Sequence, residues 1–152
     1  MPSSSLSLTT PDTVIYDLKS VDRTSAFAEM VEDLFRLRLV PADLKNVVIE
    51  ALENREKSMS TAIGRELAIP HAAIKGLPQV VRMMARSEVG IDCAARDGLP
   101  VRFFYLSLIP DNDYSTHLRT IAAVSSFFHR PDSLERIKQC KNAEELRSVF
   151  SE

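Results

Sequence analysis

His71 is the residue in this chain whose type and setting most clearly suggest chemistry. It follows a short apolar run and a proline in the segment Ala68-Ile69-Pro70-His71. Imidazole can be both neutral and nucleophilic at cellular pH. Pro70 fixes its own φ and lacks a backbone N–H, so strand pairing should stop where the ring of His71 begins. His71 is therefore a candidate nucleophile or ligand-binding group, although a lone histidine after a strand is more often a hydrogen-bonded structural group.

Arg55 is a cation that the sequence can bring to such a site. An amphipathic helix is predicted to begin near Pro41, with its apolar positions at Leu44, Val47, Val48, Ala51 and Leu52. The next step of the same spacing reaches Arg55, so its guanidinium should extend from the core-facing side at the end of the helix. By itself, an arginine in this position is more often a solvated cation that interacts with the helix dipole.

His117 belongs to the first turn of another predicted helix, which Ser115 or Thr116 could cap. The first turn of a helix offers free N–H groups and the positive end of the dipole, and both favour a nearby anion. The structural alternative is that His117 simply packs in this turn. His129 resembles a helix-end residue and is assigned no role.

The elements that must position these residues alternate between strand and helix patterns. A first strand near residues 14–18 precedes a helix around Phe27–Leu37, for which Asp22 or Thr24 is a possible N-cap. Further strands are expected at 61–63, 67–69, 80–87 and 101–109, and further helices after Ser115 and at 133–140 and 142–150. Helices therefore dominate both ends, which predicts an α/β fold with a central mixed β-sheet flanked by helices.

Length and composition predict one domain. The 152 residues are 45% hydrophobic, enough for a single core, and we expect it at residues 13–152 after a flexible lead-in at 1–12 that is rich in Ser, Thr and Pro. The net charge of -2 argues against nucleic acid or an anionic membrane as partner. Neither a spanning apolar run nor a signal peptide is present, so we expect a cytoplasmic protein without membrane insertion.

No cofactor or metal is expected from the remaining chemistry. Cys93 and Cys140 lack the close spacing of a redox or zinc motif and are expected to be reduced, buried thiols. Only 4 glycines are present, and none forms a Walker-type phosphate loop. The histidines lack metal-ligand spacing and no Ser or Cys lies in a nucleophile elbow, so a hydrolase or metal enzyme that uses His71 and His117 is the weakest alternative.

Taken together, these residues resemble the enzyme IIA domains of the bacterial phosphoenolpyruvate-dependent phosphotransferase system, mannitol/fructose class. Within it, the nitrogen-regulatory branch is the most similar. The resemblance covers roughly residues 14 to 150. It rests on these segments: Arg55-Glu56, Ser60-Thr61, Ile63-Gly64, Ala68-Ile69-Pro70-His71, Gly98-Leu99-Pro100-Val101 and His117-Leu118. Several pieces in the family's order are far more specific than an isolated Ile-Pro-His.

The resemblance implies a mechanism. In such proteins the histidine at the position of His71 accepts a phosphoryl group on Nε2 from an HPr-type carrier protein. Phosphoryl transfer is catalysed mainly by positioning and by donors that stabilise the charge on the equatorial oxygens. Arg55 would then clamp the phosphoryl oxygens, and His117 would donate to one of them. Transfer between two histidines requires no cofactor.

The chain departs from the family beside the candidate nucleophile. Arg65 follows Gly64 where relatives usually carry Gly-x-Gly, Ala72 replaces a glycine after His71, and Thr61-Ala62 replaces a common Thr-Gly. Loss of glycine could change carrier docking or the backbone amides available to phosphate. Thr61 and Arg65 are therefore possible modifiers of the site, and Arg65 could add a cation to it.

Three functions follow from the resemblance. The first is a phosphoryl-accepting regulator that signals through protein partners, among which a kinase or a potassium-transport component are possible. The second is a stand-alone sugar-specific enzyme IIA that passes phosphate to a IIB component. The third is a module on the same fold that is not phosphorylated. A separate chain of this length, without IIB or IIC domains, favours the first.

The mechanism makes a geometric prediction. The side chains of Arg55, His71 and His117 should converge on one surface depression, with His71 at least partly exposed to a carrier. We expect an apolar rim for docking from the neighbouring residues Ile69, Ala72, Ala73 and Ile74.

Overall fold

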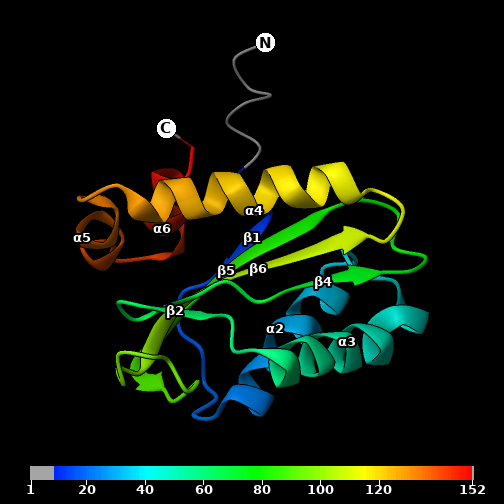
Figure 1. The fold of residues 1–152 in the computed structure, drawn as a ribbon, viewed down its shortest axis with the longest axis horizontal. Helices are drawn as coiled ribbons and strands as arrows, with labels where there is room; N and C mark the ends of the chain where they lie inside the picture. The colour runs from blue at the N-terminus through cyan, green and yellow to red at the C-terminus, as the bar shows by residue number, and fades with distance from the viewer. Residues whose placement is uncertain (1–8, 152) are drawn as a thin grey trace.

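A mixed β-sheet forms the middle layer of the structure, a computed structural model that describes residues 9–151 (Figure 1). The strands of this described part are β1 (Thr13–Ile15), β2 (Ala62–Gly64), β3 (Leu67–Ala68), β4 (His71–Ile74), β5 (Val81–Ile91) and β6 (Val101–Pro110). Their order is β1-β5-β6-β3-β2, and β4 also pairs with β6. β6 runs antiparallel to β5 and parallel to β3 and β4.

Helices cover both faces of this sheet (Figure 1). Their bounds are α2 (Arg23–Arg36), the 3-10 turn η1 (Ala42–Leu44), α3 (Lys45–Ser58), α4 (Tyr114–His129), α5 (Ser133–Lys138) and α6 (Ala143–Val149). In Figure 1, α2 and α3 lie on one side of the sheet, and α4, α5 and α6 lie on the other. The predicted α/β class with a flanked mixed sheet is confirmed.

Strand β6 contributes side chains to two apolar cores, one on each face of the sheet. Phe104, Leu106 and Leu108 belong to the apolar cluster that includes the buried residues of α2 and α3. Phe103 and Tyr105 belong to the cluster under α4, α5 and α6. Successive strand residues point to opposite faces, so a strand buried on both faces is apolar along most of its length.

The chain stays beside β6 as it passes through Pro70. The carbonyl of Pro70 accepts a hydrogen bond from the N–H of Ser107 at 3.0 Å. His71 then pairs with Ser107 and begins β4. The prediction that pairing stops at the ring is wrong, because proline removes a donor but leaves its carbonyl able to accept. His71 is consequently held in a strand.

The start of the described chain is tied to its end. The hydroxyls of Thr9 and Thr10 both donate to the carbonyl of Phe150 at 3.1 Å. These contacts fall within residues 9–12, the part of the predicted flexible lead-in that the structure describes. The rest of that predicted segment, residues 1–8, lies outside the described residues.

Among the described residues, no helix combines the length and apolar character needed to cross a bilayer. Both cysteines are free thiols, with Cys93 buried and Cys140 half-buried. Burial is the main cause that raises the pKa of Cys93 to about 12, so this thiol stays protonated at neutral pH.

Two glycines allow a test of backbone strain in the sheet region. Gly90 lies at a register shift in β5 with φ +85°, and a Cβ there would meet the Cβ of Pro100 at 2.8 Å. Gly98 has φ +73°, but a Cβ there would meet nothing within 4 Å. We expect Gly98→Ala to cost about 1–2 kcal/mol from the left-handed backbone, and Gly90→Ala to cost about 1–3 kcal/mol more from overpacking. Urea unfolding measures both costs, and equal losses of stability would contradict the assigned clash.

Candidate functional site

The side chain of His71 points toward the α4 face of the sheet. Its strand neighbours Ala72 and Ile74 are buried in the cluster shared with α2 and α3. Because alternate strand residues face opposite sides, His71 and Ala73 face α4. The ring of His71 is only partly buried.

His117 approaches His71 from the first turn of α4. The two ring centroids lie 5.4 Å apart. The helix is capped by Asp113, whose carboxylate accepts from the N–H of Thr116 at 3.3 Å, and the predicted caps Ser115 and Thr116 lie inside the helix. Nδ1 of His117 is buried and has no hydrogen-bond partner within residues 9–151. Desolvation, followed by the charge of Arg55, lowers the pKa of His117.

Arg55 lies near the end of α3 within electrostatic reach of both histidines. Its guanidinium donates one hydrogen bond from Nη1 to the carbonyl of Met59 at 2.8 Å. The positive charge contributes to the lowered pKa of His71 and of His117. The structure thus brings together the three residues that the sequence selected, from α3, β4 and α4.

The ring of His71 is held in one tautomer. Its Nδ1 lies 2.8 Å from the carbonyl oxygen of Ile69. A carbonyl can only accept, so Nδ1 carries the proton and Nε2 carries a free lone pair. Burial is the largest cause that lowers the pKa of His71, and the charges of Arg55 and His117 lower it further. The neutral, nucleophilic form therefore predominates at pH 7.

Glu56 is a residue near the site that sequence reasoning missed. Its side chain is buried, and its carboxylate accepts from the N–H of Thr61 at 3.1 Å and from the Thr61 hydroxyl at 2.8 Å. Val48, Leu52 and Glu56 form the buried line of α3, whereas Arg55 is partly exposed. The i, i+4 step from Val48 and Leu52 reaches Glu56, which is the signal that could have identified it.

Arg65 lies away from His71. Its guanidinium donates to the carbonyl of Phe128 at 2.9 Å, near the C-terminal end of α4, and its backbone N–H donates to Asp97. Phe128 is eleven residues beyond His117, which corresponds to roughly 16 Å of helix. Arg65 therefore stabilises the negative end of the α4 dipole, and the prediction that it adds a cation to the site is wrong.

The apolar surface beside the histidines differs from the predicted rim. Ile69, Ala72 and Ile74 are buried, so only Ala73 of that rim is exposed. Exposed apolar side chains lie instead at the start of α4. Tyr114 is 69% exposed with its ring 6.1 Å from that of His117, and Leu118 is 52% exposed.

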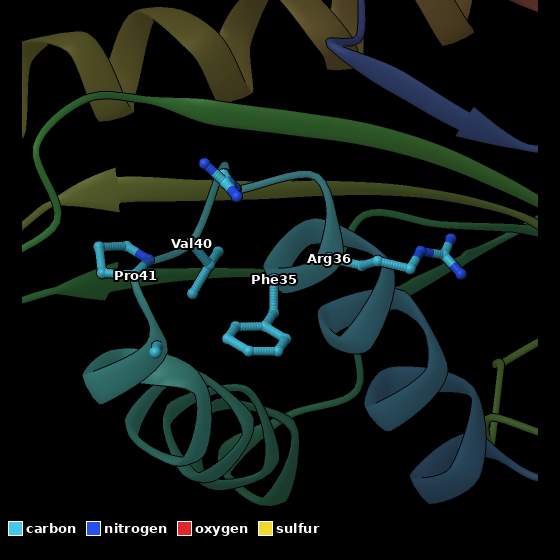
Figure 2. Close-up of a pocket in the computed structure, with 6 residues that line it drawn as sticks. Phe35, Arg36, Val40 and Pro41 are labelled. Carbon is cyan, nitrogen blue, oxygen red and sulfur yellow. The ribbon is translucent and has the colours of Figure 1, made fainter.

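A separate cavity of about 450 Å³ lies on the α2 and α3 side of the sheet (Figure 2). Its lining residues are Phe35, Arg36, Arg38, Val40, Pro41 and Ala42. Figure 2 shows Val40 and Pro41 leading from the end of α2 toward the next helix, while the side chain of Arg36 extends away from them. Neither histidine lines this cavity, so it is distinct from the histidine site.

Comparison with known families matches almost the whole chain. Residues 7–152 match the family described as "Phosphoenolpyruvate-dependent sugar phosphotransferase system, EIIA 2". A nitrogen regulatory protein of Bradyrhizobium diazoefficiens is 27% identical over 144 residues, covering 95% of this chain and 92% of that protein. The nitrogen regulatory protein of Escherichia coli is 31% identical over 107 residues, covering 70% of this chain and 66% of that protein.

Solved structures show the same fold. The nitrogen regulatory protein IIA-Ntr from Neisseria meningitidis superposes with a TM-score of 0.81 at 26% identity, covering 94% of each chain. The mannitol IIA of Escherichia coli superposes with a TM-score of 0.74 at 16% identity, covering 91% of this chain and 95% of that one. The second similarity concerns the fold alone.

The lowered pKa values predict how stability depends on pH. His71 and His117 bind fewer protons in the folded protein than in the unfolded chain as the pH falls through 6.5, the ordinary pKa of histidine. The free energy of unfolding should therefore fall as the pH falls from about 7.5 to about 5.5, by less than about 1.4 kcal/mol per pH unit for each histidine because solvent screens both rings. Urea unfolding across this range tests this. The double variant His71→Gln/His117→Gln should show a flatter dependence, and an unchanged slope would contradict the lowered pKa values.

Proposed function

This chain belongs to the EIIA 2 family of the phosphoenolpyruvate-dependent sugar phosphotransferase system, and from that premise we propose that it is a cytoplasmic regulator phosphorylated on Nε2 of His71 by an HPr-type carrier. The observation that carries the proposal is the 2.8 Å hydrogen bond from Nδ1 of His71 to the Ile69 carbonyl. It leaves Nε2 as the unprotonated nitrogen of a ring whose centroid lies 5.4 Å from that of His117.

The bond changes of the transfer step involve only His71, the phosphohistidine of the carrier and solvent. The Nε2 lone pair of His71 attacks phosphorus as the phosphorus–nitrogen bond of the carrier phosphohistidine breaks. The electron pair of that bond returns to the carrier imidazole, which takes a proton from solvent. The Nδ1 proton of His71 stays on its ring, and the Ile69 carbonyl stabilises the positive charge that the ring acquires.

Arg55 and His117 are suited to hold the transferred group. One donor of Arg55 bonds Met59, so the rest of its fork is available to phosphoryl oxygens. The transition state carries its charge on equatorial oxygens, where such donors act most strongly. His117 is favoured in its neutral form by its lowered pKa and lies at the positive end of α4. A neutral ring there can donate one hydrogen bond to the phosphate.

Signalling would follow from the new charge. Phosphate adds negative charge at a surface bordered by exposed Tyr114 and Leu118, and this changes which proteins can bind there. The relatives named nitrogen regulatory protein support a regulatory role. Target proteins would include a kinase or a potassium-transport component.

A sugar-specific enzyme IIA is the second candidate. A fructose-specific EIIA component of Haloferax volcanii is 27% identical over 110 residues, covering 72% of this chain and 71% of that protein. In this role, His71 would pass its phosphate to a IIB component. The module without phosphorylation is less favoured, because Arg65 lies near the far end of α4 and Ala72 packs into the core, away from Nε2.

The first test is phosphorylation itself. Incubation with phosphoenolpyruvate, enzyme I and an HPr-type carrier should add one acid-labile phosphoryl group, detected by intact-protein mass spectrometry. His71→Ala should abolish this gain, because it removes the nucleophile. His129→Ala, at the opposite end of α4, is the matched control and should be phosphorylated like the wild type. Equal labelling of wild type and His71→Ala would refute His71 as the acceptor.

The second test concerns Arg55 as the residue that holds the phosphoryl oxygens. Arg55→Lys keeps the charge but loses the planar donor fork, so the initial rate of phosphorylation should fall by about 10- to 100-fold. Arg38→Lys, beside the separate cavity, makes the same change away from the histidines and should leave the rate unaltered. Rapid-quench measurements at matched carrier concentration give both rates. A wild-type rate for Arg55→Lys would remove Arg55 from the mechanism.

A further inference from the structure

Two adjacent residues fix the path of the chain as it leaves α3. Arg55 bonds the carbonyl of Met59 from the exposed side. Glu56 turns inward and accepts two hydrogen bonds from Thr61. Glu56 and Thr61 are both buried. Because α3 ends at Ser58, the Glu56 carboxylate fastens the helix to the segment that follows it.

A continuous series of hydrogen bonds leads from this carboxylate to His71. The carbonyl of Thr61 accepts from the N–H of Ile69 at 3.0 Å. The carbonyl of Ile69 in turn accepts from Nδ1 of His71 at 2.8 Å. Thr61 and Ile69 are 5% and 8% exposed, so water has little access to replace these bonds. The position of the Ile69 carbonyl therefore depends on the segment that Glu56 holds.

The choice of a carboxylate at this position has a physical cost. A buried charge loses hydration, and two donors from one residue compensate only part of that loss. A neutral side chain of the same length could satisfy the same two groups, as a glutamine would by accepting from the N–H and donating to the hydroxyl of Thr61. The negative charge therefore calls for an explanation beyond fastening the loop.

We propose that Glu56 is a positioning residue for His71, acting through Thr61 and Ile69 to keep the proton on Nδ1 and the lone pair on Nε2. The carboxylate holds the loop that aims the Ile69 carbonyl, and its charge also favours the positively charged ring that phosphorylation of Nε2 produces. The expected effect on the rate of phosphoryl transfer rests on the proposed function. The expected effects on the tautomer and the titration of His71 do not.

The electrostatic surroundings of His71 agree with the second part of this role, in which the Glu56 charge stabilises a positively charged ring. Burial lowers the pKa of His71, and so do the charges of Arg55 on α3 and His117 on α4. Glu56 is the charged group that acts in the opposite direction and raises it. A purely structural anchor would leave the titration of His71 unchanged when its charge is removed.

Glu56→Gln separates charge from anchoring. The amide can keep both hydrogen bonds to Thr61 while the negative charge is lost. In two-dimensional ¹H–¹⁵N spectra of the imidazole nitrogens, the Nδ1–H tautomer should be retained and the pKa of His71 should fall below its wild-type value. Glu50→Gln removes the same charge from an exposed position on α3 and should leave that pKa unchanged. Equal pKa values in wild type and Glu56→Gln would overturn the electrostatic part of the proposal.

Glu56→Met tests the anchor. It preserves approximate length but leaves both donors of Thr61 without an acceptor, so the Ile69 carbonyl should shift and His71 should populate both tautomers. The rate of phosphoryl transfer should fall by about 10- to 100-fold, as expected for a misplaced nucleophile. A wild-type tautomer and a wild-type rate in this variant would overturn the proposal. Should the variant fail to fold, the titration of Glu56→Gln decides.

The two proposals fail in different ways. If the wild-type protein accepts no phosphate but Glu56→Gln still lowers the pKa of His71, the proposed function fails and the positioning role stands. If the wild type is phosphorylated while both Glu56 variants match it in tautomer, titration and rate, the positioning role fails and the function stands.

Discussion

The hydrogen bond between Nδ1 of His71 and the carbonyl of Ile69 is the interaction on which the chemistry of this protein depends. It joins residues on either side of Pro70, so the proline has a definite purpose: with no N–H of its own, it interrupts the donors of the strand while its carbonyl keeps the chain on β6. The Ile69 carbonyl, one residue earlier, accepts from the ring of His71. A backbone carbonyl can only accept, so it fixes the proton of His71 on Nδ1 as long as the segment between β3 and β4 holds it in place.

The sheet and the helices together position the side chains of the site. β6 is apolar on both faces and therefore supports two cores, one under each helical layer. β4 lies against this strand and turns Ala72 and Ile74 toward α2 and α3, which sends His71 toward α4. α3 then supplies two neighbouring charges with different surroundings: Arg55 partly exposed and Glu56 buried. The end of α3 thus places the cation of Arg55 where a ligand can bind it, and the carboxylate of Glu56 where it bonds the segment that follows the helix.

Much of this arrangement was predictable from sequence because it depends on local patterns. The helical spacing through Leu52 brought Arg55 to the site, and the position of His117 in a first turn followed from the apolar positions after it. Contacts between distant segments were not predictable in the same way. Arg65 bonds Phe128, 63 residues away, and no periodicity indicates such a partner. The burial of Ala72 and Ile74 likewise arises from the pairing of β4 with β6, which was not expected from the sequence after a proline.

The contact between Arg65 and Phe128 also limits how this chain can vary in length. α4 carries His117 in its first turn and is held by Arg65 near its last, so both ends have fixed surroundings. Each residue of an α-helix advances the chain by about 100° of rotation. Removing or adding one residue between these two points would turn His117 away from His71 unless the β2–β3 hairpin moved as well. Insertions and deletions of a single residue within α4 should therefore be rejected.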